Sequence, residues 1–307
     1  RAVDDKYAAL PKVRYTPAEG TPALRKAITQ LAKEKAGDEQ RLQRKTEKLY
    51  DEIAAKFDID WARIFDRCLR VVWRRIFDGM EYDDADIERF RQTARKAPTI
   101  IVPSHRSHVD YLVVSQVLFW NNLVPPHIAA GINLSFFPLG PWLRRSGAYF
   151  LRRTFRGDPL YPRVFRAYVK RLFREGFVQE FFIEGGRSRT GKTLPPKLGM
   201  LSMLVDAFLE SKEEDACFVP SSISYEKVVE AKSHARELMG GEKKVESAGS
   251  LLGLGKVLRQ RYGRVHITFG APISTREAIF SRQFNRKEMS SQDRRALIND
   301  LANRIVF

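Results

Sequence analysis

Cysteine is scarce in this sequence: Cys68 and Cys217 are the only two among 307 residues, and they lie far apart. Without CxxC spacing, neither a disulfide framework nor a zinc site is indicated, and a reducing cytoplasm is expected. Long apolar runs are also missing, as is an apolar signal-peptide core near the N-terminus. We therefore expect a chain that does not itself span a bilayer. Because it begins with Arg1 rather than Met, we also expect a processed or truncated polypeptide.

Acidic residues are outnumbered, since 37 Asp and Glu stand against 54 Lys and Arg, for a net charge of +17. About half of the excess is local: residues 144–192 hold thirteen basic and four acidic residues, a net +9. Such a surplus predicts an anionic partner, which could be nucleic acid, an acidic protein, an anionic membrane surface or a phosphorylated small molecule. With 43% apolar residues, the chain can bury a core of one large domain or two smaller ones.

The apolar pattern divides the chain at residue 98. Before it, apolar residues recur at spacings of three and four in 21–37, 39–57 and 60–79, which predicts a helical N-terminal region over 1–98. Residues 99–307 alternate short β-rich runs with amphipathic segments, which is typical of an α/β domain. The expected strands lie in 99–104, 127–134, 147–155, 178–184, 216–225 and 264–273, and the expected helices in 108–120, 162–176, 199–211 and 251–263.

A nucleotide-binding pattern, GxxxxGK[ST], fits Gly186–Thr193 letter for letter. A P-loop also needs a helix that begins at the Lys-Thr pair, so that its N-terminus faces the phosphates. Pro195 and Pro196 would interrupt that helix within its first turn. We therefore keep a P-loop NTPase as an alternative, and favour another anion held by the same loop.

The residues of this loop suit an oxyanion or a phosphate. Gly185 and Gly186 permit a tight turn, and three basic side chains, Arg187, Arg189 and Lys192, follow it as donors. Glu184 precedes the turn, and we expect it to form an ion pair that orients an arginine.

A possible general base follows the first expected strand. His105 and Asp110 are five positions apart, an offset that would put them on different faces of one helix, so a turn must separate them. Ser107 and Asp110 resemble a capping box, which predicts a helix start at Ser107 with His105 in the preceding turn. Asp110 could then reach back to the imidazole and leave its other nitrogen as a base. The structural alternative is that Asp110 only caps the helix and His105 only bonds a turn carbonyl.

The other histidines carry less signal. His108 would lie in the first helical turn as a supporting or incidental residue, His127 and His234 have no evident partner, and we expect His266 to lie on a strand face.

Arg152 and Arg153 end an expected strand, where successive side chains point to opposite faces. We expect one to face an anion and the other to meet solvent or an acidic side chain; a solvated strand end is the alternative.

Four segments in order, "HRSHVDYL", "GAYFLRR", "FFIEGGRSRTGK" and "VPSSISYE", resemble the four sequence blocks of the glycerolipid acyltransferases, especially the bacterial ones that act on glycerol 3-phosphate. The resemblance covers about Thr99 to Pro272. It implies a mixed central sheet flanked by helices, and transfer of an acyl group from acyl-CoA or acyl carrier protein to the sn-1 hydroxyl of glycerol 3-phosphate. Members of the family are usually longer chains.

The resemblance also implies roles for individual residues. His105 would take the proton from the hydroxyl, with Asp110 orienting it. The substrate-binding set would comprise Arg153, Glu184, Gly185, Gly186, Arg187, Ser188, Arg189, Lys192 and Pro220. Within it, Arg153, Arg187 and Ser188 would bind glycerol 3-phosphate, and Pro220 would belong to the fourth block, with a role in acyl-chain placement. No metal or cofactor is required.

Because the product would be a lipid, we expect peripheral attachment to an anionic membrane, at the cytoplasmic face of the bacterial inner membrane. Two basic-aromatic segments suit this contact: 69–77, with Trp73, and 136–147, with Phe136, Phe137 and Trp142. Ordinary core packing is the alternative for both.

A nucleic-acid-binding protein is a further alternative, but its basic residues should form a stripe interleaved with exposed aromatics. Here they surround a His/Asp pair and a Gly-rich turn, so no nucleic acid is expected as a partner.

Overall fold

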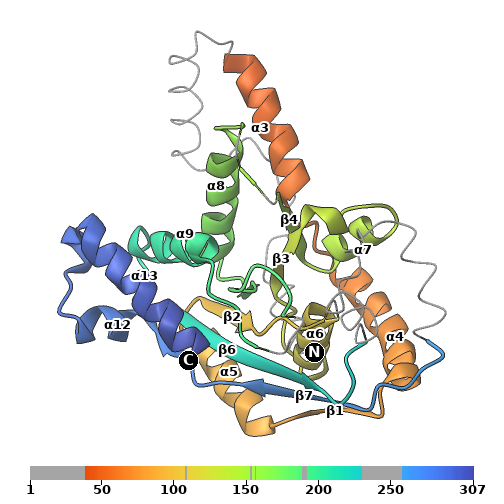
Figure 1. Ribbon diagram of the computed structural model, residues 1–307. Helices are drawn as coiled ribbons and strands as arrows, with labels where there is room; N and C mark the ends of the chain where they lie inside the picture. The colour runs from red at the N-terminus through yellow and green to blue at the C-terminus, as the bar shows by residue number, and fades with distance from the viewer. Residues whose placement is uncertain (1–38, 108, 153, 156, 189–191, 230–257) are drawn as a thin grey trace, which may run out of the picture.

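The computed structural model describes residues 39–107, 109–152, 154–155, 157–188, 192–229 and 258–307. A single sheet runs through them (Figure 1). Several sequence predictions lie outside the described residues: the helix over 21–37, most of the helix over 251–263, and His108, Arg153, Arg189 and His234.

The sheet has eight strands in the described residues, and seven of them follow the order β1-β7-β6-β2-β5-β3-β4. Most neighbours are parallel, whereas β6 pairs antiparallel with both β7 and β8. The predicted α/β class with a mixed central sheet is therefore confirmed. The strands are β1 (Gly79–Tyr82), β2 (Thr99–Pro103), β3 (His127–Gly131), β4 (Ala148–Leu151), β5 (Gln179–Glu180), β6 (Cys217–Tyr225), β7 (Arg264–Phe269) and β8 (Ile273–Ser274).

Helices cover both faces of the sheet, as Figure 1 shows. One face carries α3 (Glu39–Ile53), α8 (Tyr161–Arg174), α9 (Leu198–Leu209), α12 (Thr275–Ser281) and α13 (Ser291–Val306). The other carries α4 (Ile59–Ile76), α5 (Asp84–Lys96), α6 (Asp110–Trp120) and α7 (Leu139–Arg145). The described residues also contain two short 3-10 helices, η2 (Ile132–Leu134) and η4 (Arg286–Glu288). Adjacent strand residues alternate between the faces: Ile100 packs with the first group and Ile101 with the second.

Helix α4 illustrates how the sequence positions its elements. Asp58 caps it by accepting the N–H groups of Asp60 and Trp61. Its buried side chains include Ala62, Trp73 and Ile76, on the stripe that faces the sheet. Trp73 is 4% exposed, so the prediction that it sits at a membrane interface is wrong. An indole at this position contributes to the core, and the alternative of ordinary packing holds for this side chain.

The N-terminal region is helical as predicted, in α3, α4 and α5, but it also contributes a strand. β1 pairs in parallel with β7, from Gly79 opposite Arg264 to Tyr82 opposite Ile267. In the same core, Ile87 and Phe90 of α5 pack with strand residues from beyond position 98. The domain boundary between residues 98 and 99 stays a prediction, although residues on both sides of it share this core.

Two helices near the C-terminus, α12 and α13, had no counterpart in the sequence predictions. Helix α13 begins with a capping box: Ser290 Oγ accepts the N–H of Asp293, and the Asp293 carboxylate accepts the N–H of Ser290. Its apolar side chains Leu297 and Leu301 are fully buried against the α8 and α9 face. The capping pattern and the apolar spacing were both present in the sequence and were overlooked.

Candidate active site

The site forms where three adjacent parallel strands end. His105 lies in the loop after β2, and Glu184 lies in the turn after β5. The Glu184 carboxylate accepts the backbone N–H of His105 at 3.0 Å, and the backbone N–H of Ser188 donates to the His105 carbonyl at 2.8 Å. Both backbone groups of His105 are therefore held by the Gly-rich turn, which joins the first and third sequence blocks in space.

The imidazole of His105 is held on two sides. Its Nδ1 lies 2.9 Å from Oδ2 of Asp110, and its ring stacks on Phe182 with centroids 3.9 Å apart. The His105 side chain is 14% exposed and that of Asp110 is fully buried. A carboxylate on Nδ1 favours the tautomer with the proton on that nitrogen, which leaves Nε2 as a proton acceptor. This is the arrangement that a general base requires.

Asp110 does more than contact His105. Its Oδ2 also accepts the backbone N–H groups of Arg106 at 2.7 Å and Ser107 at 2.9 Å. Helix α6 begins at Asp110 rather than at Ser107, so the predicted helix start is wrong. The reason is that the Asp110 side chain bonds N–H groups of the loop that precedes the helix, which holds that loop in a turn. Stabilising the turn and orienting the imidazole are thus two roles of one carboxylate.

Sequence reasoning missed Tyr225, the last residue of β6, although it lies in the fourth block. Its hydroxyl donates to Oδ1 of Asp110 at 2.6 Å, a length typical of an O–H donor on a charged carboxylate. The contact spans 115 positions of sequence, and no local pattern could have revealed it.

Sequence reasoning also missed Glu180, on β5 beneath α6. Its carboxyl group is fully buried, and neither oxygen has a hydrogen-bond partner among the described residues. Burial, together with the nearby charge of Asp110, raises the pKa of Glu180 well above its ordinary value. Burial therefore favours the protonated, neutral form of Glu180 near the site.

The turn after β5 is shaped by Glu184 and Gly185. Both Glu184 oxygens accept backbone N–H groups, the second from Leu194 at 3.0 Å. The predicted ion pair with an arginine is not found in the described part of the chain, because the carboxylate is occupied by these backbone donors. Gly185 has a φ of +59°, and a Cβ there would lie 2.6 Å from the side chain of Lys197. The left-handed φ favours glycine at this position, whereas the flexible Lys197 side chain could move aside.

The remaining predicted ligands lie around the same turn. Ser188 is buried and its hydroxyl donates to the carbonyl of Lys192. Arg187 and Gly186 are half-buried, and Lys192 is exposed. A P-loop needs a helix that begins at Lys192. In the described part of the chain the next helix, α9, begins only at Leu198.

Two further predictions concern the neighbouring strands. Arg152 forms a bidentate ion pair with Glu52 of α3, both contacts at 2.6 Å, so one arginine of the pair meets an acidic side chain, as predicted. Its neighbour Arg153 lies outside the described residues. Pro220 lies on β6 opposite Val102 of β2, and its carbonyl accepts the N–H of Gly270. Its role in substrate binding stays a prediction.

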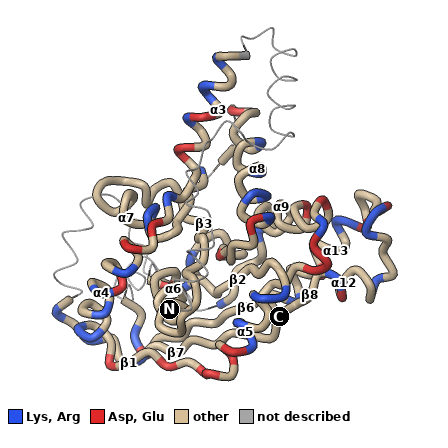
Figure 2. The backbone as a smooth tube through the Cα atoms, turned by 180° about the vertical axis from the view of Figure 1, so that it is seen from behind, with Lys and Arg blue, Asp and Glu red and all other residues tan. Residues whose placement is uncertain are grey.

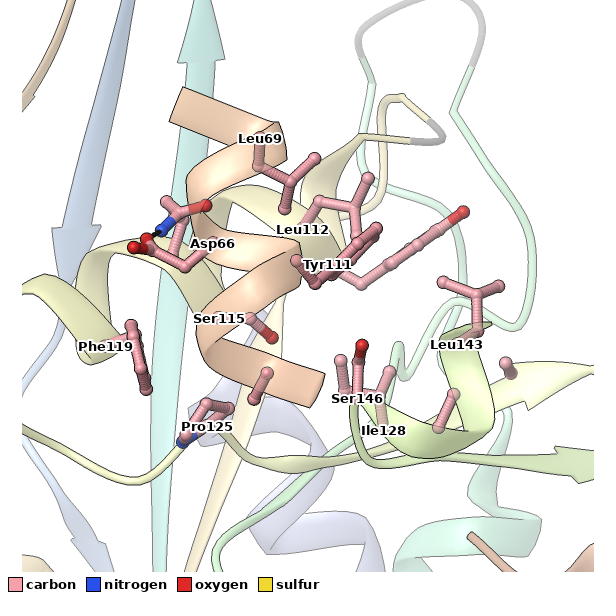
Figure 3. A pocket seen from close by; sticks show the side chains of 15 residues that line it. Asp66, Leu69, Tyr111, Leu112, Ser115, Phe119, Pro125, Ile128, Leu143 and Ser146 are labelled. Atoms are coloured by element: carbon pink, nitrogen blue, oxygen red, sulfur yellow. Dashed lines mark hydrogen bonds between the residues drawn. The ribbon is translucent and has the colours of Figure 1, made fainter. Parts of the chain in front are cut away.

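An apolar pocket lies between α4, α6 and α7 (Figure 3). Tyr111, which follows Asp110 in the sequence, is one of the residues that line it. Figure 3 shows side chains of α4 and α6 on one side and Leu143 and Ser146 on the other. Most of the wall is apolar, including Phe65, Leu69, Leu112, Phe119, Ile128 and Leu143. An apolar lining of this kind favours apolar groups over charged ones.

Comparisons with known proteins agree with this geometry. The Acyltransferase family model matches residues 85–224, and the model of the glycerol-3-phosphate acyltransferase C-terminal region matches residues 234–307. The chain belongs to the glycerolipid acyltransferase family. This membership favours the acyltransferase interpretation over the P-loop NTPase and the nucleic-acid-binding protein.

Relatives of this chain include the glycerol-3-phosphate acyltransferase of Pasteurella multocida, 43% identical over 277 residues, which are 90% of this chain and 34% of that protein. The enzyme of the same name from Ectopseudomonas mendocina is 41% identical over 92% of this chain and 34% of its own length. The chain thus spans about a third of these curated relatives. A crystal structure of a 1-acyl-sn-glycerophosphate acyltransferase from Thermotoga maritima aligns at 14% identity with a TM-score of 0.40, over 80% of this chain and 77% of that one.

Proposed function

We propose that this chain carries the acyltransferase site of a glycerol-3-phosphate 1-O-acyltransferase. It would transfer a fatty acyl group from acyl-CoA or acyl carrier protein to the sn-1 hydroxyl of glycerol 3-phosphate, giving lysophosphatidic acid, without a cofactor. The observation that carries the proposal is the contact of His105 Nδ1 with the buried Asp110 carboxylate at 2.9 Å. The names of the relatives support the substrate class.

In the proposed mechanism, Nε2 of His105 takes the proton of the sn-1 hydroxyl as its oxygen attacks the thioester carbonyl. The new C–O bond forms, the C–S bond breaks, and the departing thiolate takes the proton from the imidazolium. Asp110 stabilises the imidazolium between these two steps. General-base assistance of this kind contributes about 10²–10⁴-fold to the rate.

The phosphate would bind at the turn after β5. Arg187 and Ser188 are our proposed ligands there, together with Arg153, Arg189 and Lys192. Ser188 supports this placement, because its backbone N–H is already bonded to the His105 carbonyl, so a ligand at this turn lies next to the base. Glu184, Gly185 and Gly186 would shape the turn without contacting phosphate. Arginine is suited to this role because its planar group binds phosphate through two parallel hydrogen bonds.

The acyl chain would enter the apolar pocket that Tyr111 helps to line. A chain held there would place its thioester carbonyl toward the N-terminus of α6, where His105 and Asp110 lie. The apolar wall supports this assignment, because each buried methylene gains about 0.8 kcal/mol of transfer free energy.

We further propose that α4 and α7 rest on an anionic membrane, at the cytoplasmic face of the bacterial inner membrane. Ile64 and Val71 on the outer side of α4 are 49% and 71% exposed, and Phe137 and Trp142 near α7 are 82% and 45% exposed. Figure 2 shows Lys and Arg along α4. The two helices contact each other through Trp61 of α4 and Trp142 of α7, whose ring centroids are 6.1 Å apart. In the described part of the chain, no helix is long and apolar enough to cross a membrane.

The charge of this face also supports an anionic surface. Within the described residues, three arginines of α4 have no ion-pair partner: Arg67, Arg74 and Arg75. Each basic residue near an anionic bilayer contributes about 1 kcal/mol of attraction.

A thioester-transfer assay with glycerol 3-phosphate tests the proposed reaction. Free thiol and lysophosphatidic acid should appear together for the unchanged chain, and His105→Ala should reduce both by about 10²–10⁴-fold. His266→Ala is the matched control, because His266 also lies 3.0 Å from a carboxylate, that of Glu81, but on the exposed surface of β7. Equal activity of the two variants would refute the assignment of His105 as the base.

A further inference from the structure

The two oxygens of Asp110 have different partners. Oδ2 accepts from the loop N–H groups and contacts His105, whereas Oδ1 accepts the Tyr225 hydroxyl as its one hydrogen-bond donor within the described residues. A carboxylate bound through one oxygen alone can rotate about its Cβ–Cγ bond. The Tyr225 contact at 2.6 Å fixes that rotation and therefore fixes the oxygen that faces the imidazole.

Tyr225 is itself held by the fold. It is the last residue of β6, opposite Val265 of β7, so its backbone is part of the sheet. Its ring lies 6.1 Å from that of Phe77, which follows α4. The phenol thus reaches Asp110 from a rigid strand, and not from a loop that could move away.

The charged groups around Asp110 do not duplicate this contact. From β5, Glu180 is a buried acid that makes no hydrogen bond within the described residues, and its burial favours the protonated form. From the turn after β5, Glu184 is bonded to backbone N–H groups. From the loop before α6, Arg106 contributes its backbone N–H. Tyr225 is therefore the one side-chain hydroxyl that these contacts bring to the carboxylate.

We propose that Tyr225 is a positioning residue of the acyl-transfer reaction, which fixes the orientation of the Asp110 carboxylate and reduces its pull on the imidazole proton. The kinetic part of this inference rests on the proposed function. A phenol donor withdraws negative charge from the carboxylate it binds. Without it, Asp110 would bind the imidazolium more tightly, and His105 would stay protonated to a higher pH. Protonated His105 cannot act as a base.

Tyr225→Phe removes the hydroxyl and keeps the ring. We expect kcat to fall about tenfold, which corresponds to the loss of one charge-assisted hydrogen bond, while the KM for glycerol 3-phosphate stays within about twofold. The acidic limb of the kcat/KM profile should move to higher pH. Tyr168→Phe is the matched control: its hydroxyl also takes part in a buried hydrogen bond, accepting the N–H of Ala55 at 3.0 Å, on the opposite face of the sheet. It should lower the melting temperature and leave the pH profile unchanged.

Imidazole NMR separates this inference from the proposed function. The His105 resonance, assigned by its loss in His105→Ala, should titrate at higher pH in Tyr225→Phe than in the unchanged chain, whether or not the chain transfers acyl groups. An unchanged midpoint would overturn the role of Tyr225, as would a kcat loss no larger than the loss of folded protein. Absence of transfer by the unchanged chain, with a shifted midpoint, would instead reject the proposed function and support the Tyr225 contact.

Discussion

Glu184 accepts the backbone N–H of His105 across 79 positions of sequence, at 3.0 Å. Its second oxygen holds the N–H of Leu194, so one 4%-exposed carboxylate ties the loop after β2 to the turn after β5. The position of His105, the proposed base, is therefore set by a residue that does not contact its ring.

Glu184→Ala should destabilise the protein by about 1–3 kcal/mol, because two buried donors lose their acceptor. Acyl transfer per folded molecule should also fall, since His105 loses a backbone anchor. Urea unfolding and the transfer assay measure the two effects. Glu210→Ala is the control: its pair with Lys170 is on the surface, and exposed pairs contribute less than about 1 kcal/mol. Equal costs for the two variants would contradict the anchoring role.

Glu180→Gln should stabilise the protein increasingly as the pH rises. The pKa of Glu180 is raised in the folded state by burial and then by Asp110, so between the unfolded value near 4.5 and the folded value the native state holds a proton that the unfolded state has lost. Stability is therefore full below about pH 4.5 and falls as the pH rises. Glutamine cannot lose this proton. The difference in unfolding free energy between variant and unchanged chain should grow from pH 5 to pH 8; parallel curves would show that Glu180 does not titrate this way.

His127 should destabilise the protein in acid. Burial lowers the pKa of His127 to about 4, and its Nδ1 has no partner among the described residues. Between pH 6.5 and 4, His127 binds a proton in the unfolded chain but not in the folded one. The free energy of unfolding is therefore highest above pH 6.5 and decreases as the pH falls. The loss is ~3 kcal/mol by pH 4. His127→Phe should lose less over this range, because phenylalanine cannot be protonated and still packs on Phe177, whose ring centroid is 4.7 Å away. Identical pH curves by urea unfolding would contradict this.

Val71→Glu and Ile64→Glu should each weaken sedimentation with anionic vesicles, because they place charge on the face proposed to meet the bilayer. Binding should also weaken with salt. Phe280→Glu is the control: Phe280 is 83% exposed but lies on α12, on the other side of the sheet. Equal loss for the α12 variant, or equal binding to neutral and anionic vesicles, would reject the α4 face.

The spacing of apolar and polar residues along the sequence predicted several helices of the fold, and it also pointed to the His105–Asp110 pair of the site. Periodicity located α4, α6, α8 and α9 to within a few residues, and the offset of five between His105 and Asp110 predicted their contact through a turn. Strand β1 was missed because its four residues, all half-buried, lack alternation. Such a strand is recognisable only by its partner β7.

The rest of the site depends on contacts that sequence spacing does not encode. Tyr225 reaches Asp110 because β6 and β2 are neighbours, and Glu184 reaches His105 because β2 and β5 are. Glu180 reads as an ordinary polar residue until the sheet and α6 bury it. In each case the deciding fact is strand order, which a single sequence leaves open.

The strand order also makes the proposed acyl transfer depend on the cooperative folding of the sheet. Because β6, β2 and β5 are adjacent and parallel at the centre of the sheet, the base, its carboxylate partner and their anchors come together only when all three strands are paired. Fraying of the outer strands β1 or β4 leaves this centre paired, whereas no partly unfolded form that lacks it can hold the dyad. Loss of transfer in denaturant should therefore coincide with global unfolding, so that catalysis serves as a probe of the whole sheet.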